Sequence, residues 1–428
     1  MSAQLVKKSV ASIAAAGMMC LLCGSAQAED MQVQYPVAAY TAEELAKVQE
    51  WEKTWAGKKI DKSNIDQVAQ FLPEQMVQLY KDPKKWGAPE KDGLFFSITP
   101  YQQVIETKGV IAATKKYAPM VKVNADGDIV NYAEIAGVPF PNPKNGLEIA
   151  WNYDFNTHGD ANHYARKGPV VSPGVAIERT THQDQWELYW IHRTDVEPMP
   201  AYEKNEKGIH RGLFLHLYDP PESQNSRFFN LRYIDKNKED DGYMWYAPFR
   251  RVRRINVGQR TDTIDGTDMI YDDEYGWDGH IQRNTYQLIG KKDMLASRHT
   301  DTKNFQRAQG QAIPNNVTRE RVSTYVVEVK SKDPNYIYSK RVWYVDPETY
   351  LVLWTELYDE LKRPWKCFEY LHADFKTKKG EMKNMIVGVL LLDFQRTHAS
   401  LPLQEIFEVG TEKVDKSMFT ISYLQQAY

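Results

Sequence analysis

The chain has 428 residues, a net charge of −3, 26% charged residues and 12% aromatic residues, among them 26 tyrosines and 11 tryptophans. Proteins that bind duplex nucleic acid usually concentrate strong positive charge, so this mildly acidic balance argues against nucleic acid as a partner. The abundant aromatic residues favour a β-rich protein with large apolar surfaces.

The first 28 residues have the pattern of a secretory signal. Lys7 and Lys8 precede an apolar stretch at 10–23, and Ala26-Gln27-Ala28 supplies a small-x-small cleavage site. The stretch is shorter than the roughly 18 to 20 residues that span a bilayer, and no other segment is as long and apolar. We therefore expect cleavage before Glu29 and export of a soluble protein that is not integral to the membrane.

Export has consequences for the three cysteines. Cys20 and Cys23 fall within the predicted signal, which leaves Cys367 as the only thiol of the exported chain. Cys367 lies in an apparent strand between Trp365 and Phe368, where a buried, unreactive thiol is expected. The exported chain would hold 52 basic and 57 acidic residues and no internal disulfide.

Residues 29–136 are predicted to be a helical N-terminal region. Thr41 followed by Glu44 forms a capping box, and Gly57 ends the first helix. Apolar residues at helical spacing between 65 and 79 predict two short helices or one kinked helix around Pro73. Thr99 and Pro100 predict the start of a helix that reaches Tyr117.

A stretch rich in proline and glycine at 137–155 leads into the predicted main domain, 137–428. Its prolines exclude a regular element in the first half, whereas a helix is expected from Asn145 onward. From about Gly174 apolar residues alternate with period two and turn residues separate the runs, which predicts antiparallel strands. The predicted strands are 211–219, 226–234, 242–247, 283–295, 321–330, 340–346, 350–359 and 365–375.

Catalytic and nucleotide-binding motifs are missing from the sequence. It contains no nucleophile elbow, phosphate-binding loop, zinc-protease helix or dinucleotide-binding turn. The densest group of histidines is His182, His192, His210 and His216. On alternating strands His182 and His192 would share a face and, with Asp184, could bind a metal or transfer protons. Because no fixed ligand spacing recurs, we predict no catalytic residue, no metal and no cofactor.

An acidic cluster offers a second metal hypothesis, because hard cations take carboxylate oxygens. The cluster lacks the EF-hand order, and a second partial match at Asn124, Asp126 and Asp128 has Ile129 at the glycine position. Solvated turns are the favoured interpretation of both segments. The cluster consists of Asp262, Asp265, Asp268, Asp272, Asp273, Glu274 and Asp278.

The stretch DDGYMWYAPFRRVRRI at 240–255 predicts a hairpin with its turn at Pro248-Phe249. This turn pairs Trp245 with Val252 and Met244 with Arg253. The arginines then either brace the hairpin against acidic neighbours or form a rim that meets anionic lipid headgroups.

Several segments together resemble a family of large exported Gram-negative proteins that is catalogued as a domain of unknown function. The resemblance rests on GVPFPNPKNGLEIAWNY, the hairpin, the acidic stretch 262–279, YQLIGKKDM and YSKRVWYVDPETYLVLWTELYDELKRPWK. It implies a fold similar to that of LolA and LolB, the outer-membrane lipoprotein-sorting proteins. That fold is α+β, an incomplete antiparallel β-barrel whose cavity is capped by helices. It also implies association with RND-type exporters and outer-membrane proteins, and supplies no catalytic residues.

We accordingly expect a periplasmic carrier for a lipid or other hydrophobic ligand. The alternatives are a non-catalytic accessory or scaffold subunit of an RND-type exporter and, third, a hydrolase of lipids or polymers. Arg250 and Arg254 are the expected rim of the cavity. The expected cavity residues, each taken from one face of a strand, are Leu213, Leu215, Leu217, Phe229, Leu231, Trp245, Val252, Tyr325, Val327, Trp343, Val345 and Trp354.

Overall fold

A computed structural model describes residues 33, 35–90, 93–156, 159–255, 260–264 and 266–426. The predicted signal, 1–28, lies outside the described residues. Residues 34–428 form one compact unit by their internal contacts. No helix among the described residues is long and apolar enough to cross a membrane.

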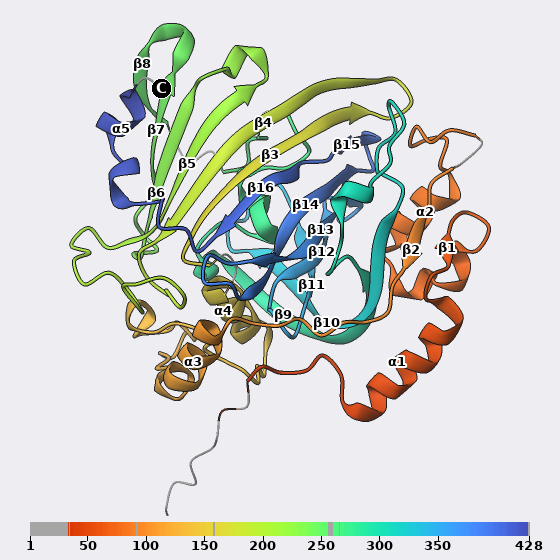
Figure 1. The fold of residues 1–428 in the computed structure, drawn as a ribbon, viewed down its shortest axis with the longest axis horizontal. Helices are drawn as coiled ribbons and strands as arrows, with labels where there is room; N and C mark the ends of the chain where they lie inside the picture. Colours follow the sequence, from red (N-terminus) through yellow and green to blue (C-terminus); the bar gives the residue numbers. More distant parts are fainter. Residues whose placement is uncertain are drawn as a thin grey trace, which may run out of the picture. The chain divides into compact units, whose positions relative to one another are not determined.

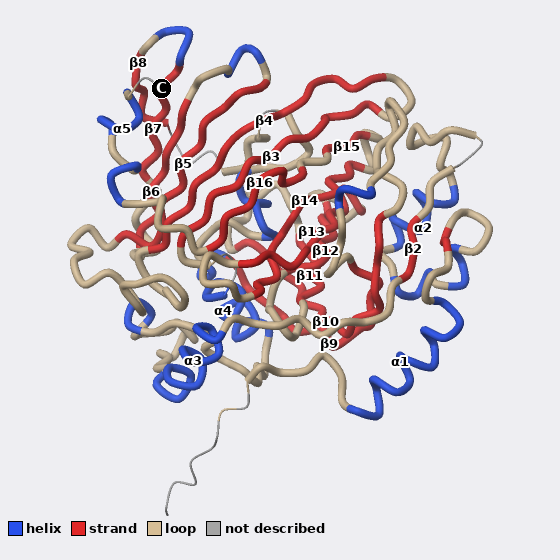
Figure 2. Tube along the Cα trace, viewed as in Figure 1, coloured by secondary structure: helices blue, strands red, loops and turns tan. Residues whose placement is uncertain are grey.

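The unit is built on one long, curved sheet, which Figure 2 shows as a nearly continuous series of strands with the helices around it. The predicted strands are all present, whereas the long strands β3, β4 and β14 are not among the predicted ranges. The strands are β1 (Lys59–Ile60), β2 (Phe96–Ile98), β3 (Ala161–Ser172), β4 (Ala176–Tyr189), β5 (Ile209–Asp219), β6 (Arg227–Tyr233), β7 (Asp241–Tyr246), β8 (Arg251–Ile255), β9 (Asn284–Ala296), β10 (Val317–Ser331), β11 (Lys340–Val345), β12 (Val352–Tyr358), β13 (Pro364–Lys376), β14 (Met382–Asp393), β15 (His398–Ser400) and β16 (Leu403–Val409).

Strand pairing runs in the order β1-β2-β10-β11-β12-β13-β14-β15-β3-β4-β5-β6-β7-β8, with β9 on β10 and β16 between β14 and β3. Apart from the parallel pair β2–β10, the pairs are antiparallel. Among the described residues no pairing joins β8 to β9, so the sheet curls without closing. The fold is therefore an incomplete antiparallel barrel with helices, of class α+β, as predicted.

The described ranges contain five α-helices, which pack on the sheet (Figure 1). Thr41 and Glu44 form the predicted capping box of α1. Asn145 accepts a hydrogen bond from the N–H of Glu148 at the start of α4, as its sequence predicted. The helices are α1 (Ala42–Trp55), α2 (Glu74–Lys81), α3 (Lys108–Tyr117), α4 (Gly146–Asn156) and α5 (Ile421–Gln425).

The predicted start of α3 at Thr99 and Pro100 is wrong, because α3 begins at Lys108 with Thr107 as its cap. The preceding residues stay extended since carboxylates from other parts of the fold satisfy their backbone. The N–H of Tyr101 donates to Glu52 and the N–H of Val104 donates to Glu348. Long-range acceptors thus replace the hydrogen bonds that a helix would have made.

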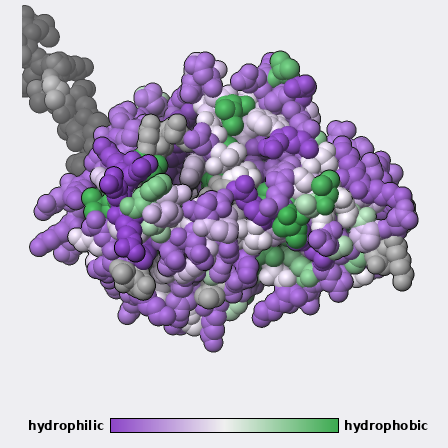
Figure 3. Space-filling view, turned by 90° about the horizontal axis from the view of Figure 1, so that it is seen from above, coloured by the Kyte–Doolittle hydropathy of each residue, from purple (hydrophilic) through white to green (hydrophobic). Residues whose placement is uncertain are grey.

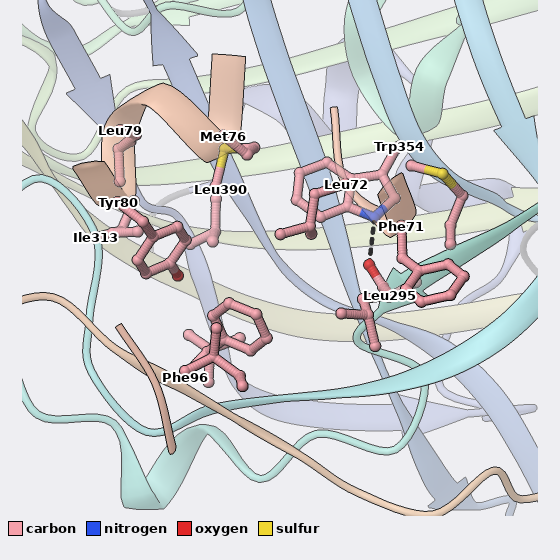
Figure 4. Close-up of a cluster of buried hydrophobic side chains, with 14 of the residues drawn as sticks. Phe71, Leu72, Met76, Leu79, Tyr80, Phe96, Leu295, Ile313, Trp354 and Leu390 are labelled. Atoms are coloured by element: carbon pink, nitrogen blue, oxygen red, sulfur yellow. Dashed lines mark hydrogen bonds between the residues drawn. The ribbon is translucent and has the colours of Figure 1, made fainter. Parts of the chain in front are cut away.

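The larger core lies between the outer face of the sheet and the N-terminal elements, where α2 and the short turns before it cover β10 to β14. Figure 4 shows Phe71, Leu72, Met76 and Tyr80 against side chains of the sheet. Trp354 is fully buried there, and its Nε1 donates to the carbonyl of Leu295 at 3.0 Å. Cys367 is buried in the same core, as expected.

A second core forms where the C-terminal residues and α5 cover the outer face of β5 to β7. Phe214, Phe229 and Leu231 are buried against Phe419 and Leu424. This core fixes which face of these strands is left for the interior of the curved sheet.

Arg319 and Glu369 form a fully buried ion pair in the larger core, with 2.5 Å between Nη2 and Oε2 and neither side chain exposed. Tyr80 accepts a hydrogen bond from Arg319, and the hydroxyl of Ser297 donates to Glu369. Removing one charge from such a pair leaves the other buried and uncompensated.

We predict that Arg319→Met lowers the free energy of unfolding by about 3 to 5 kcal/mol, because Glu369 would then be buried without its partner. Urea unfolding followed by circular dichroism measures the loss. Lys47→Met is the matched control, since it breaks the exposed pair Lys47–Glu43 and is expected to change stability little. Equal losses in the two variants would contradict the expectation.

Candidate functional site

The loop between β8 and β9 folds back along the inner face of the sheet, and its described part is called the inner segment (residues 260–264 and 266–283). Arginines of four strands hold it there. Arg166 of β3 pairs with Glu274 at 2.6 Å and Arg232 of β6 with Asp278 at 2.6 Å. Arg211 of β5 also pairs with Asp278, and Arg341 of β11 pairs with Asp273.

Tyrosines add a second set of contacts to the inner segment. The hydroxyl of Tyr153 in α4 donates to the backbone carbonyl of Trp277 at 2.8 Å. The hydroxyl of Tyr370 in β13 donates to the backbone carbonyl of Asp273 at 2.9 Å. Tyr275 donates to Glu187 in β4. The inner segment and α4 therefore fill much of the space enclosed by the sheet.

The sequence expectation of solvated turns is wrong for most of the acidic cluster. Asp268, Asp272 and Asp273 are at most 2% exposed and are paired with basic or hydroxyl groups. Asp262 is exposed, and Asp265 lies outside the described residues. The expectation holds for Asn124, whose side chain accepts from the N–H groups of a surface turn.

No group of three potential metal ligands converges in the part of the chain that the structure describes. Five acids of the inner segment are instead used in ion pairs, namely Asp268, Asp272, Asp273, Glu274 and Asp278.

Electrostatics set the protonation of the acids beside the arginines. Burial raises the pKa of Asp278, but Arg211 and Arg232 outweigh it and hold that pKa well below its ordinary value. For Glu187 burial dominates and raises the pKa despite Arg211. One carboxylate thus stays charged while its neighbour is drawn toward the neutral form.

A cavity of about 270 Å³ remains between the inner segment and strands β3 to β8. Its apolar wall is a strip of three leucines on β5, namely Leu213, Leu215 and Leu217, extended by neighbouring apolar side chains. Its polar wall comes from β3, β4 and the inner segment. The remaining lining residues are Arg166, Gln183, Gln185, Glu187, Arg211, Phe228, Asn230, Met244, Ile255, Arg260, Asp262, Ile264, Tyr271, Glu274 and Asp278.

Three polar atoms of the lining residues are buried without a hydrogen-bond partner among the described residues. They are Oε2 of Glu187, Oδ1 of Asn230 and Nη2 of Arg260. An unpaired buried polar group costs about 1 to 3 kcal/mol. The cavity itself is amphipathic, because the leucines of β5 face charged and amide side chains such as Arg166, Gln183 and Glu187.

Of the twelve residues expected to line a cavity, the structure places Leu213, Leu215 and Leu217 in it. Phe229 and Leu231 face the core beneath α5, and Trp245 and Val252 pack against that core. On β6 and β7 the residues that line the cavity are instead the sequence neighbours Phe228, Asn230 and Met244. Aromatic or apolar residues occur on both faces of β6 and β7, so alternation could not distinguish the faces.

The other five expected cavity residues lie further along the sheet. Trp354 is in the outer core. Trp343 and Val327 pair across β10 and β11 and are fully buried, with Tyr153 of α4 at 5.3 Å from Trp343 between ring centroids. Tyr325 and Val345 are paired and buried on the same strands. None of the five lines the cavity.

The four histidines of the densest group do not converge on one site, and only His192 and His210 lie side by side. His182 lies 3.8 Å from Asp219, and His216 packs on Tyr218. His192 lies beyond the end of β4 with φ 62°, buried and stacked on Phe155 at 3.7 Å between ring centroids. His210 is beside His192, at 5.3 Å between ring centroids. The expected shared face of His182 and His192 is therefore wrong.

The hairpin has the predicted pairing, with Trp245 opposite Val252 and Met244 opposite Arg253. Arg254 pairs with Asp241, at the base of the hairpin, and so acts as a brace. Arg250 occupies the turn with φ 48°. The same pairing puts Arg253 on the face of Met244, beside the cavity, and Arg254 on the opposite face.

Two further hollows differ in character. One of about 510 Å³ is an open, polar surface depression near Lys167, Glu178 and Asp219. Another of about 360 Å³, lined by Tyr132, Asp154, His210 and His280 among others, lies beyond Arg232. Neither has the continuous apolar wall of the first cavity.

We predict that burial of His192 makes the protein acid-sensitive. Burial lowers the pKa of His192 from 6.5 to about 3. As the pH falls from 6.5 toward 3, the unfolded chain therefore binds a proton at this histidine while the folded chain does not. In that window wild-type stability should fall by about 1 kcal/mol per pH unit relative to His192→Asn, a residue that tolerates positive φ.

Urea unfolding of both proteins between pH 7 and about 4 measures this difference. Asp154, whose pKa burial raises to about 6, acts in the opposite direction but is present in both proteins. A difference that does not vary with pH would show that His192 is not held neutral by burial.

Solved structures with remote similarity include a domain assigned to outer-membrane lipoprotein sorting in Vibrio parahaemolyticus, with 15% identity and TM-score 0.46, covering 66% of this chain and 98% of that one. A DUF1329 family protein from Desulfovibrio piger has 14% identity and TM-score 0.47, and the match covers 65% of this chain and 97% of that one. A LolA superfamily protein from Nitrosomonas europaea has 11% identity and TM-score 0.40, covering 66% and 100%. No curated protein matches the sequence.

The family model described as a protein of unknown function, DUF1329, matches residues 59–425. This match spans most of the chain and includes the hairpin, the acidic stretch and the β11–β13 segment from which the sequence resemblance was drawn. The protein therefore belongs to the DUF1329 family.

Proposed function

We propose that this protein is a periplasmic carrier that binds a lipid or other amphiphilic ligand without covalent chemistry. The observation that carries the proposal is the strip of Leu213, Leu215 and Leu217, which faces an unfilled space. Apolar side chains that face such a space favour a ligand with an apolar part. Export rests on the predicted signal at 1–28, and the periplasm as its destination rests on the resemblance to exported Gram-negative proteins.

The polar wall defines how such a ligand would lie. Its apolar part would run along the leucines of β5, and its polar group would meet the polar side chains that line the cavity, among them Glu187, Asn230 and Arg260. Arg260 also pairs with Asp272, so its remaining Nη2 is held in place as a donor. A purely apolar ligand would offer these side chains no hydrogen bond, which favours an amphiphile.

Size limits the ligand. A cavity of about 270 Å³ is just below the range of roughly 300 to 1,000 Å³ that is typical of small-molecule sites, so we infer a ligand with a single chain. Burying each methylene contributes about 0.8 kcal/mol, so about ten carbons would supply several kcal/mol after the costs of ordering. Because the sequence lacks a nucleotide-binding motif, release would require a tighter acceptor or an energised partner.

We predict that Leu215→Glu weakens binding of an apolar fluorophore such as N-phenylnaphthylamine at least tenfold, because a carboxylate would enter the apolar wall. Titration of fluorescence, and displacement by a fatty acid of about ten carbons, measure the effect. Mass spectrometry of lipids bound to protein isolated from periplasm would identify the natural ligand.

Leu361→Glu is the matched control, since Leu361 is 71% exposed in a surface turn and its substitution should leave binding unchanged. Thermal unfolding of both variants tests whether they fold. Unaltered binding by folded Leu215→Glu, or isolated protein that carries no lipid and binds no fluorophore, would refute the carrier function.

A second candidate is a non-catalytic accessory subunit of an RND-type exporter. It is favoured by how much of the enclosed space α4 and the inner segment occupy, for example where Tyr153 packs on Trp343. Co-purification with an exporter from membranes, together with the absence of bound lipid, would support this candidate over the carrier.

A further inference from the structure

The tip of the β7–β8 hairpin, residues 246–253, is strongly basic. Arg250, Arg251 and Arg253 are exposed, and no ion pair joins them to the acids of the described ranges. Arg254 differs from these three because it pairs with Asp241. The tip therefore presents three positive charges to the surroundings.

An aromatic side chain accompanies these charges. Phe249 is 59% exposed at the turn, stacks on Tyr246 at 5.2 Å between ring centroids, and lies 5.7 Å from the guanidinium carbon of Arg253. Single exposed apolar residues are common on protein surfaces. An exposed aromatic ring among arginines, however, is the combination that binds the interface of an anionic membrane.

Acidic groups near the tip are already occupied. Asp241 at the hairpin base is used by Arg254, and the carboxylate of Glu222 lies 3.7 Å from Arg179. The backbone carbonyl of Glu222 accepts a hydrogen bond from the hydroxyl of Tyr246 in the tip. These acids do not neutralise the three arginines.

The tip adjoins the cavity. Strand pairing sets Arg253 opposite Met244 and Arg251 opposite Tyr246, so both arginines share the face of β7 and β8 that carries Met244 and Ile255. Met244 and Ile255 line the cavity. The charged tip is thus continuous with the cavity wall at the edge of the sheet.

The hairpin also projects from the unit. In Figure 1 its turn lies at the top left, at the opposite end of the view from α3. Figure 3 looks onto that end, and its strongest hydrophilic colour gathers at the left, on the side of β6 to β8. A flat charged surface could reach this tip before it reached the N-terminal helices.

We propose that the hairpin tip docks the protein on an anionic phospholipid surface, with Arg250, Arg251 and Arg253 at the headgroups and Phe249 at their acyl boundary. This inference deepens the proposed function, because it places the cavity next to the membrane that would supply or receive a lipid. The attraction arises from charge complementarity and is screened by salt.

Co-sedimentation with vesicles tests the proposal, using phosphatidylethanolamine mixed with phosphatidylglycerol and, separately, phosphatidylcholine alone. We expect the whole protein to bind the anionic vesicles at low salt and to be released at about 1 M salt, where the screening length is ~3 Å. Each basic residue near such a surface contributes about 1 kcal/mol, so Arg250→Gln, Arg251→Gln and Arg253→Gln together should weaken binding by about 100-fold.

The matched control removes the same charge at the opposite end of the unit, by Lys115→Gln, Lys116→Gln and Lys122→Gln, all exposed. It should change vesicle binding far less than the arginine triple variant. Phe249→Ser should weaken binding while leaving its salt dependence in place. The arginines are exposed, so thermal unfolding of the triple variant should match that of wild type.

Equal binding to the two vesicle types, no binding at low salt, or equal losses in the two triple variants would overturn the proposal. Capture of an acidic protein without binding to anionic vesicles would overturn it as well. Fluorophore binding to the cavity is a separate measurement and should be unchanged in the arginine variant, so failure of docking can be told apart from failure of the carrier function.

Discussion

Burial of the inner segment against the arginines of the sheet is the interaction on which the interior depends. Asp273 and Arg341 are almost completely buried together, and Arg211 and Arg232 share Asp278. A charge taken out of water is costly unless it is paired, so neither the acids nor the arginines would be stable there alone. The pairs keep the loop between β8 and β9 inside a sheet that does not close.

This packing determines what kind of site is left. Where the inner segment and α4 fill the concave face, Tyr153 of α4 packs on Trp343 at 5.3 Å between ring centroids. Where the segment passes β5, it faces Leu213 and its neighbours across an open space and contributes Arg260 to the lining. The same loop therefore fills one part of the interior and supplies part of the polar wall of the other.

Much of the fold could be predicted from local pattern. Period-two alternation located most strands, and the register at Trp245 and Val252 followed from the turn. The start of α3 could not be predicted, because the distant carboxylate of Glu348 satisfies the backbone N–H of Val104. The lining residues of β6 and β7 were missed because Phe228 and Phe229 are equally suited to either face. The faces are assigned by strand pairing, because Phe228 lies opposite Leu215 on the cavity side and Phe229 lies opposite Phe214 on the core side.

The sequence by itself determined that this is a β-rich chain of the DUF1329 family with a basic hairpin and no catalytic motif. These properties follow from composition, from the alternation of apolar residues and from short motifs. Tertiary structure alone decided which strand faces enclose a space and whether the acids of the inner segment are solvated or buried. Those outcomes depend on residues far apart in the chain, such as Arg341 and Asp273, whose contact no local pattern encodes. Long-range pairing and desolvation, rather than residue type, made this acidic loop part of the interior.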